Sequence, residues 1–376
     1  MVLLWRSVGP YHLARARAAA ERMAARGVHV VVVELCDGEE TRDWRIDRTG
    51  AGVEIVTLAP GTRLTGRSQN LTSKLIATFE QLRPVCVAVA GYDRPEMRAA
   101  LRWGNENSAV VLMSETKADD RARPWWKRML IAREVRLAQA ALVSGSAAGE
   151  YLVSLGMLRE KVFRQYGAVD NAYFREHAYE RRNGDGRMFL ACCRLIESRK
   201  NIVRLLRAYS QYRHRVEEPW ELVICGDGPD RSTYEEYVRE RRIEGVTLAG
   251  FQQVEPLAGY YARAGCFVHP AVNEAWGLVV NEALASGLPV LVSRRCGCAY
   301  DLVHEGVNGY TFDPHEHVEL AELMQRISES PAERLRQMGH ESLRIVSRHG
   351  CEAFAQGLES AYCATTAELH ESAADS

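Results

Sequence analysis

Residues 266–293 read CFVHPAVNEAWGLVVNEALASGLPVLVS, and this stretch predicts a strand, a helix and a second strand in succession. The first run, CFVH, is short and apolar and ends at Pro270. The pattern EAWGLVVNEALASG, residues 274–287, has the length of a helix and stops at Gly287, a signal for a helix C-terminus. The run PVLVS, residues 289–293, is again an apolar strand. Together they predict one strand–helix–strand unit of a parallel sheet.

The same alternation runs through the whole chain of 376 residues. Apolar, β-branched runs of strand length alternate with helical patterns, and each run is too uniformly apolar for a half-exposed face. These runs cover residues 28–35, 85–92, 109–115, 140–146, 188–194, 221–229, 246–250, 266–270 and 289–293. They predict an α/β fold with two doubly wound domains, each a parallel sheet covered by helices on both faces. Two such domains facing each other form a central cleft, and ligands bind at the carboxyl ends of the strands.

The domain boundaries are predicted from a break in this rhythm. Hydrophobic periodicity stops in REHAYERRNGDGR, residues 175–187, where charged residues and glycine dominate. We predict an N-terminal Rossmann-like domain over 1–175, a linker over 176–187 and a C-terminal Rossmann-like domain over 188–350. Residues 351–376 then form a C-terminal helix and tail.

Composition and charge indicate a soluble globular protein. The chain is 47% hydrophobic and 26% charged, and it has no biased tract. A formal net charge of -1 gives no bulk electrostatic attraction to nucleic acid, so we expect no nucleic-acid partner. The apolar run before Arg6 is too short for a signal peptide, and no stretch supplies the ~20 apolar residues of a membrane span. We therefore expect a cytoplasmic protein.

The ten cysteines indicate neither disulfides nor a metal site. Six of them lie within or beside apolar runs, where cysteine behaves as a small buried hydrophobe. Cys296 and Cys298 flank Gly297 in RRCGCAY, but the second close pair that a zinc site needs is missing. We expect a turn with two small residues here, and no metal.

Two cations follow the apolar run of residues 188–193. MFLACCRLIESRKN places Arg194 at the end of a strand and Lys200 at the start of the next helix. In the expected cleft, an arginine fork and a mobile lysine suit phosphate oxygens. The alternative is solvated surface charge. The nearby Gly226 and Gly228 do not complete a dinucleotide fingerprint, because Arg231 stands where a third glycine is required.

Glu274 and Glu282 lie at both ends of the apolar stretch EAWGLVVNE. On one helix, eight residues advance about 12 Å and rotate about 80°. That separation excludes a glycosidase pair, whose carboxyls lie about 5–10 Å apart. It suits one elongated ligand, with an anionic group near the amides of Ala275, Trp276 and Gly277 at the helix N-terminus. The alternative is an acid that stabilises the helix dipole together with a solvated acid.

Segment 269–314, HPAVNEAWGLVVNEALASGLPVLVSRRCGCAYDLVHEGVNGYTFDP, resembles the signature of the family 4 retaining glycosyltransferases, the group 1 enzymes of GT-B fold that use nucleotide sugars. FLACCRLIESRKNIVRLLRAY resembles the G-R-L…K-N segment of that family, and ELVICGDGP, VTLAGFQ and YGAVDNAYF match in order. Ala271 stands where serine is usual, and Cys193 replaces a common glycine. The resemblance covers the C-terminal half and touches the N-terminal half mainly through SVGPYHLAR. It implies an acceptor-side N-terminal domain, a donor-binding C-terminal domain and a C-terminal helix that crosses back.

The resemblance also implies a role for each matched residue. Arg194 and Lys200 would neutralise the donor diphosphate and the leaving nucleotide. Glu274 would bind hydroxyls of the donor sugar, and Glu282 would hold the ribose hydroxyls. The remaining donor-side residues would be the amides of Ala275, Trp276 and Gly277 around the sugar, Phe251 and Gln252 against the base, and Gly9 near the phosphates.

One departure from the family pattern concerns the acceptor side. Many relatives have a histidine at the end of an N-terminal-domain strand, facing the donor sugar. The comparable strand here ends in Ser114, Glu115, Thr116 and Lys117. Glu115 is a candidate for that place. His12 is another, with loop packing as its alternative explanation.

A basic, aromatic segment lies in the N-terminal half. RARPWWKRMLIAREVR, residues 121–136, joins Trp125 and Trp126 to six basic residues. With Arg15, Arg17, Arg22 and Arg26 it would give this domain a positive face for a membrane surface or a lipid acceptor. The alternative is a solvated helix whose tryptophans pack inward.

The resemblance implies a metal-independent, retaining glycosyltransferase. It would move a sugar from a nucleotide diphosphate, a UDP or GDP sugar, to a glycan, a lipid-linked acceptor or a small molecule, without a further cofactor. Arginine, lysine and helix amides would stabilise the departing diphosphate in place of a metal. The sequence has no D-x-D motif at a strand end. The alternatives are a GT-B sugar-nucleotide epimerase and a nucleotide-sugar-binding protein without catalysis.

Overall fold

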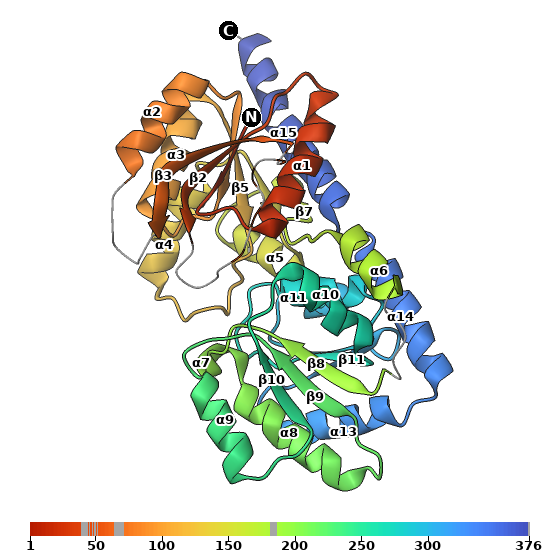
Figure 1. Ribbon diagram of the computed structural model, residues 1–376. Helices are drawn as coiled ribbons and strands as arrows, with labels where there is room; N and C mark the ends of the chain where they lie inside the picture. Colours follow the sequence, from red (N-terminus) through yellow and green to blue (C-terminus); the bar gives the residue numbers. More distant parts are fainter. Residues whose placement is uncertain are drawn as a thin grey trace. The chain divides into compact units, whose positions relative to one another are not determined.

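The structure is a computed structural model of the chain, and it describes residues 1–38, 44, 46, 48, 50, 52–63, 71–180 and 186–374. Contacts divide the chain into two compact units (Figure 1). Unit 1 comprises Met1–Val169 and Gly350–Ser376, and unit 2 comprises Asp170–His349. Each unit is built on its own parallel sheet.

The described part of unit 1 holds a seven-stranded parallel sheet in the order β3-β2-β1-β4-β5-β6-β7. Its strands are β1 (Val2–Trp5), β2 (Val31–Gly38), β3 (Glu54–Arg63), β4 (Cys86–Ala90), β5 (Ala109–Ser114), β6 (Ala140–Val143) and β7 (Val162–Arg164). Its helices are α1 (Pro10–Ala24), α2 (Thr72–Leu82), α3 (Pro95–Asn107), α4 (Trp125–Val135), α5 (Ser146–Ser154), the 3-10 turn η1 (Arg159–Lys161) and α15 (Cys351–Ala374). The strand order runs outward in both directions from β1 and β4, so the sheet is doubly wound.

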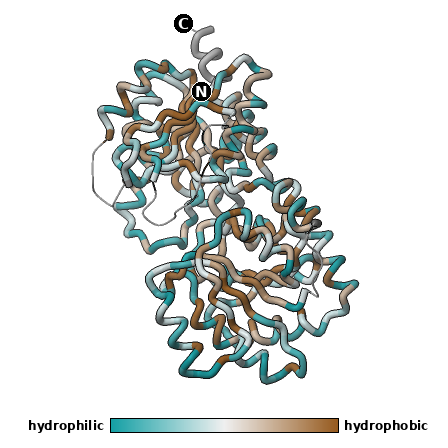
Figure 2. The backbone as a smooth tube through the Cα atoms, in the orientation of Figure 1, coloured by the Kyte–Doolittle hydropathy of each residue, from teal (hydrophilic) through white to brown (hydrophobic). Residues whose placement is uncertain are grey.

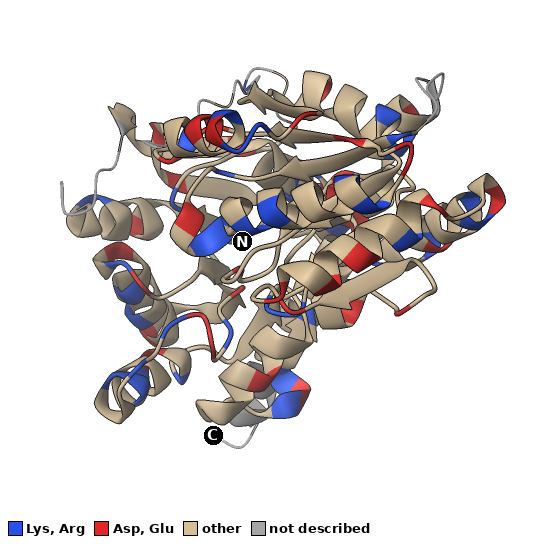
Figure 3. Ribbon diagram, turned by 90° about the horizontal axis from the view of Figure 1, so that it is seen from below, with Lys and Arg blue, Asp and Glu red and all other residues tan. Residues whose placement is uncertain are grey.

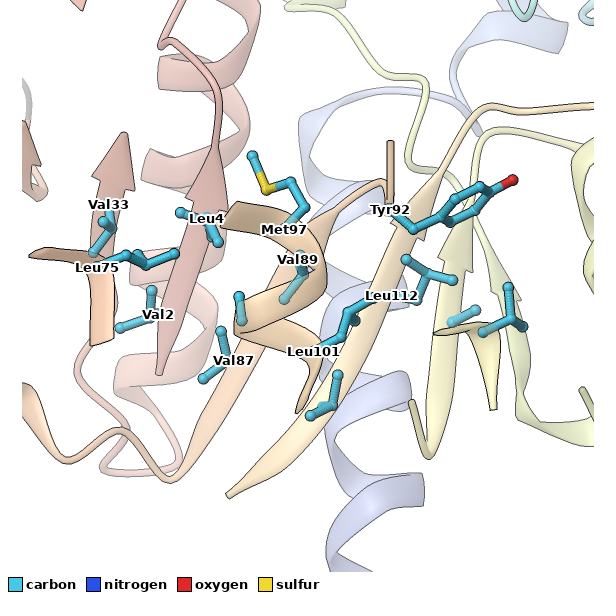
Figure 4. Packing of buried hydrophobic residues seen from close by; sticks show 14 of the residues in the cluster. Val2, Leu4, Val33, Leu75, Val87, Val89, Tyr92, Met97, Leu101 and Leu112 are labelled. Atoms are coloured by element: carbon cyan, nitrogen blue, oxygen red, sulfur yellow. The ribbon is translucent and has the colours of Figure 1, made fainter. Parts of the chain in front are cut away.

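Both faces of the unit 1 sheet are buried. Successive residues of a strand point to opposite faces. Val2 and Leu4 therefore pack in a cluster with α2 and α3, which Figure 4 shows around Met97, whereas Leu3 and Trp5 pack in a second cluster with α1 and α15. Because helices cover both faces, the central strands β1, β4, β5 and β6 have no polar side, which explains their uniformly apolar sequences (Figure 2).

The C-terminal helix α15 returns to unit 1, as the sequence predicted, and packs along α1. Phe354 of α15 is fully buried, and the guanidinium carbon of Arg15 lies 5.9 Å from its ring centroid. Arg15 is itself only 1% exposed and donates a hydrogen bond of 2.9 Å to the backbone carbonyl of Tyr166. Arg15 therefore joins α1, α15 and the segment after β7 from inside the core.

Over the residues that the structure describes, unit 2 has a six-stranded parallel sheet in the order β10-β9-β8-β11-β12-β13. Its strands are β8 (Met188–Cys192), β9 (Glu221–Cys225), β10 (Val246–Gly250), β11 (Cys266–His269), β12 (Val290–Ser293) and β13 (Gly309–Phe312). Its helices are α6 (Asn171–Glu180), α7 (Glu197–Lys200), α8 (Ile202–Arg215), α9 (Arg231–Glu240), α10 (Val254–Arg263), α11 (Leu278–Ala285), α12 (Ala299–Leu302), α13 (His317–Ser328) and α14 (Ala332–Val346).

The segment predicted as a linker, 176–187, begins as helix. Helix α6 extends to Glu180, while residues 181–185 lie outside the described residues. Phe174 of α6 is buried and packs edge-on against Tyr261 of α10, with 5.8 Å between ring centroids. This contact places α6 in unit 2, so the division by contacts falls after Val169 and not after residue 175. The polar composition around α6 concealed its buried face, and the domain limits drawn from composition stay a prediction.

We predict that Phe354→Ala lowers the free energy of unfolding by about 3–5 kcal/mol, because it removes a buried aromatic ring between α15 and α1. Urea unfolding followed by circular dichroism measures this loss. Glu352→Gln is the matched control on the same helix: its ion pair with Arg22 is exposed, and its loss costs less than about 1 kcal/mol. Equal stability of Phe354→Ala and wild type would contradict the proposed packing of α15.

Candidate functional site

The candidate residues of unit 2 converge where the winding of its sheet reverses. Strands β8 and β11 are neighbours, and the order runs outward from them in both directions. Arg194 and Lys200 follow β8, and Glu274 follows β11. In open α/β sheets the crevice at the carboxyl ends of two such strands is the usual ligand site.

Lys200 and Glu274 form an ion pair at this position, through Nζ and Oε2. Their side chains are mostly buried, with exposures of 13% and 15%. His269 Nε2, at the end of β11, lies 3.4 Å from the same carboxylate oxygen. Burial alone would raise the pKa of Glu274, but His269 and Lys200 lower that pKa well below its usual value. Glu274 is therefore a carboxylate flanked by two nitrogen groups.

Asn201 fixes the position of Lys200. Its backbone has a φ of 59°, a left-handed conformation that separates α7 from α8. Its buried side-chain Nδ2 donates to the carbonyl of Pro270 at 3.2 Å and to that of Pro314 at 2.7 Å. Lys200 and Asn201 thus act together. Asn201 holds the turn between α7 and α8 against the segments after β11 and β13, and Lys200 reaches Glu274.

Arg194 is held in the segment that continues β8. The amide of Cys193 donates to the carbonyl of Cys225 at 3.0 Å, and that of Leu195 donates to Asp227 at 2.9 Å. The side-chain Nε of Arg194 is buried and finds no hydrogen-bond partner among the described residues. A buried guanidinium donor without a partner is costly, so this atom is suited to an anionic ligand.

Gly226 and Gly228 serve packing at this strand end. A Cβ atom on Gly226 would lie 1.8 Å from the carbonyl oxygen of Cys193, and one on Gly228 would lie 2.3 Å from that of Leu195. Only glycine allows the loop after β9 to approach the segment of Arg194 this closely. The glycines are thus accounted for without a dinucleotide fingerprint.

The helix predicted over 274–287 is shorter than expected. Helix α11 begins at Leu278, because Gly277 adopts a φ of 104° that a helix cannot continue through. Glu274 lies before the helix in a short parallel bridge with Cys296. The predicted helical separation of Glu274 and Glu282 is therefore wrong.

The other donor-side candidates differ in exposure. Glu282 is 1% exposed and accepts a hydrogen bond of 2.8 Å from the hydroxyl of Tyr261. Trp276 is also 1% exposed, and its Nε1 donates to Asn281 Oδ1 at 2.9 Å. Its side chain is thus used inside the unit, and only the backbone of Trp276 and Ala275 is left to contact a ligand at the loop. Beyond β10, Phe251 is 37% exposed, and Gln252 donates to the carbonyl of Ala249 at 2.8 Å.

The candidates in unit 1 have structural partners of their own. The amide of Gly9 donates to His12 Nδ1 at 3.0 Å, and the His12 ring lies 5.0 Å from that of Trp5. His12 therefore caps the start of α1 and packs on β1, and its place facing the donor sugar stays a prediction. Glu115 is half-buried after β5, where it adds to the rise that burial causes in the pKa of Tyr166.

The expected positive face of unit 1 is smaller than the sequence indicated. Arg15 is buried, and Arg22 and Arg26 form ion pairs with Glu359 of α15. Figure 3 shows charges of both signs interspersed along the helices. The basic residues of α1 are thus used within the unit.

Helix α4 departs from the expectation that its tryptophans pack inward. Trp125 is 73% exposed and Trp126 is 48% exposed. Met129 and Leu130, one turn further on, are 63% and 58% exposed. The four side chains form an exposed apolar group, which we call the α4 patch.

Two kinds of feature are absent from the part of the chain that the structure describes. None of the helices that the described residues form is both long and apolar enough to span a membrane. Within the same residues, no cluster of three or more His, Cys, Asp or Glu is arranged to hold a metal ion.

Residues 174–343 match the family described as "Glycosyl transferases group 1". The chain resembles this family over that segment, which is 170 of its 376 residues. The matched residues lie within unit 2, the unit that carries Arg194, Lys200 and Glu274.

Curated relatives match the chain over parts of their length. A GDP-mannose-dependent alpha-mannosyltransferase of Corynebacterium glutamicum is 40% identical over 93 residues, which are 25% of this chain and 21% of that protein. A D-inositol 3-phosphate glycosyltransferase of Corynebacterium diphtheriae is 30% identical over 165 residues, 42% of this chain and 38% of that protein. The chain thus matches less than two-fifths of the length of either relative.

Solved structures share the fold over nearly the whole chain. The Anabaena protein HepE in complex with UDP has a TM-score of 0.73 at 16% identity, covering 95% of this chain and 98% of HepE. Sucrose-phosphate synthase from Thermosynechococcus elongatus has a TM-score of 0.74 at 19% identity, covering 98% and 99%. The chain therefore has the α/β GT-B fold that the sequence predicted.

We predict that Glu274→Gln changes how stability depends on pH. The folded-state pKa of Glu274 is lowered, so its contribution is present above the unfolded value of about 4.3 and is lost as pH falls through the folded value. At pH 7 the variant should be less stable by about 1.5–3 kcal/mol, because a hydrogen-bonded charge is removed. Urea unfolding at pH 7 and in acid should show the two proteins converging as pH falls. A constant difference at every pH would contradict the ion pair.

Proposed function

We propose that the protein is a retaining glycosyltransferase that moves a sugar from a nucleotide diphosphate to an acceptor. The observation that carries the proposal is the Lys200–Glu274 ion pair beside the unpartnered Nε of Arg194. It places two cations and one carboxylate at the switch point of the sheet in unit 2. The match of residues 174–343 to the group 1 glycosyl transferases supports the same reaction.

The chemistry follows from the charges that develop during the reaction. Breaking the bond between sugar and diphosphate leaves negative charge on the diphosphate oxygens. Arg194 and Lys200 would stabilise this charge by charge-assisted hydrogen bonds in a site that excludes water. We propose that Lys200 leaves Glu274 for the phosphate when the donor binds, and that Glu274 then accepts hydrogen bonds from the sugar hydroxyls.

We propose a UDP or a GDP sugar as the donor. HepE was solved with UDP, and the mannosyltransferase relative depends on GDP-mannose. Phe251 exposes enough of its ring to stack on a base. Glu282 would hold the ribose hydroxyls. Because Glu282 is buried, the donor would have to approach it at the strand ends, on the side where α11 lies.

The same site requires no metal in this proposal. Two side-chain cations and the amides of the loop Ala275–Gly277 would provide the positive charge that a bound metal provides elsewhere. No further cofactor is needed, because the donor carries its own leaving group.

We further propose a cytoplasmic protein with an acceptor that is a glycan, a lipid-linked molecule or a small molecule. The α4 patch supports contact with the inner face of a membrane, since four exposed apolar side chains lie among basic residues. These basic residues are Arg121, Arg123, Lys127, Arg128 and Arg133, and residues 121–133 contain no Asp or Glu. Such a surface favours an anionic bilayer.

We predict that Lys200→Ala lowers the turnover of donor hydrolysis by about 10²–10³-fold, the loss seen when one group that stabilises a developing anion is removed. Release of free sugar and nucleotide from UDP and GDP sugars, separated by chromatography, measures this. Arg207→Ala, an exposed cation on α8, is the matched control and should keep wild-type turnover.

Three results would contradict the proposal in different ways. Normal turnover in Lys200→Ala would remove this residue from the site. An epimerised donor in place of free sugar would favour the epimerase. Loss of activity in EDTA, restored by a divalent cation, would overturn the metal-independent mechanism.

We predict that the protein sediments with vesicles that contain phosphatidylglycerol and not with vesicles of phosphatidylcholine alone. Replacing Trp125, Trp126 and Leu130 together by serine should lower vesicle binding at least tenfold, because the apolar contact is lost while the charges remain. Leu158→Ser, at a residue that is 60% exposed elsewhere in unit 1, is the matched control. Unchanged binding of the triple variant would exclude the α4 patch as the contact.

A further inference from the structure

A pair of thiols lies next to the loop that contains Glu274. Cys296 and Cys298 are in the turn between β12 and α12, and their sulfur atoms are 3.4 Å apart. Cys296 is 4% exposed and Cys298 is fully buried. Both are free thiols, as are all the cysteines of the chain, each of which the structure describes. The two sulfurs are therefore aimed at each other across one glycine.

The dithiol turn is fastened to the candidate site through the backbone. The amide of Gly297 donates to the carbonyl of Glu274 at 3.0 Å, and that of Cys298 donates to Trp276 at 3.1 Å. The Cys296 thiol donates to the same Trp276 carbonyl at 2.8 Å. A Cβ atom on Gly297 would lie 1.7 Å from the carbonyl oxygen of Ala275. The two loops have no free space between them, so a change in the dithiol is transmitted to the segment of Glu274.

The two thiols are chemically unequal. Burial alone would raise the pKa of Cys296, but contacts with Cys298 and His269 lower that pKa to about 6. Burial raises the pKa of Cys298 well above its usual value, and the neighbouring Cys296 raises it further. Cys296 is therefore the more acidic of the two thiols. That arrangement suits a nucleophilic cysteine with a resolving partner.

We propose that Cys296 and Cys298 are a peroxide-sensitive modification site, which hydrogen peroxide converts into an intramolecular disulfide. The Cys296 thiol loses its proton, its sulfur attacks one peroxide oxygen and the O–O bond breaks. Sulfenic acid forms, and the released proton converts the departing hydroxide to water. The Cys298 sulfur then attacks the Cys296 sulfur and expels the oxygen as hydroxide, while the thiol proton neutralises hydroxide to water. Overall two thiols and one peroxide give one disulfide and two waters. The two electrons go to peroxide, a molecule small enough to reach a sulfur with little exposure.

Disulfide formation would change the candidate site. The sulfur atoms must approach from 3.4 Å to about 2.05 Å, and Cys296 loses the proton that it donates to Trp276. At the same time His269 loses its contact with the Cys296 thiol, and His269 itself lies beside the Glu274 carboxylate. We expect weaker binding of the donor nucleotide in the oxidised form, and this consequence alone rests on the proposed function.

The test uses the full-length wild-type protein, reduced, freed of reductant and then treated with hydrogen peroxide. Remaining thiols are blocked with N-ethylmaleimide, and the protein is digested and analysed by mass spectrometry. We expect the peptide that contains Cys296 and Cys298 to lose two hydrogens and to escape alkylation. Cys192 and Cys193, an adjacent pair whose thiols have raised pKa values, are an internal control and should be alkylated.

Single variants separate the two roles. Cys298→Ser should accumulate sulfenic acid at Cys296, detected as a dimedone adduct, because the resolving thiol is missing. Cys296→Ser should leave Cys298 reduced. Full alkylation of both thiols in treated wild type, or dimedone labelling of Cys298 in place of Cys296, would overturn the proposal.

Thermal shift with UDP and GDP distinguishes this inference from the proposed function. A shift in the reduced protein that decreases at least threefold after oxidation supports both. A disulfide in a protein that neither nucleotide stabilises supports the dithiol site and contradicts the glycosyltransferase. An unchanged shift in a fully oxidised protein would overturn the link between the dithiol and donor binding.

Discussion

The ion pair between Lys200 and Glu274 joins two loops that lie 74 residues apart in the sequence. It exists because β8 and β11 are neighbours in a parallel sheet, so that their carboxyl ends deliver both loops to one place. Asn201 then holds the lysine corner against Pro270, next to the loop of Glu274. The arrangement of charge in the proposed donor site depends on this single contact and on the packing that supports it.

Burial explains why the polar groups gather there. Both sheets are covered on two faces, so the strands have little room for charge except at their ends. The exceptions are informative. His269 is a buried strand residue whose Nε2 lies beside the Glu274 carboxylate, and Arg15 is a buried helix residue whose guanidinium donates to backbone carbonyls. The buried guanidinium of Arg15 thus has local acceptors.

The sequence predicted the strands and helices whose patterns repeat along the chain. It failed where the conformation of one residue decides where an element begins. Uniformly apolar runs were enough to predict two doubly wound sheets, and the ends of those runs indicated Arg194, Lys200 and Glu274. The predicted start of α11 was wrong, because the backbone angle φ of Gly277 cannot be inferred from the apolar residues around it.

Side-chain environments were predicted less well than strands. Arg15 lies in a run of alternating arginine and alanine that is typical of a surface helix, yet it is buried. The tryptophans of α4 have an apolar character that is typical of a core, yet they are exposed. Nothing in the apolar run around His269 indicated that this residue lies at the candidate site. For Arg15 the neighbours that decide the environment, Tyr166 and Phe354, come from distant parts of the sequence.

A crystal structure with a bound nucleoside diphosphate sugar would test the central claim most directly. We predict that the diphosphate oxygens lie within hydrogen-bonding distance of Arg194 Nε and Lys200 Nζ, with Glu274 turned from the lysine to the sugar hydroxyls. A donor bound elsewhere, with Lys200 still paired to Glu274, would contradict the account.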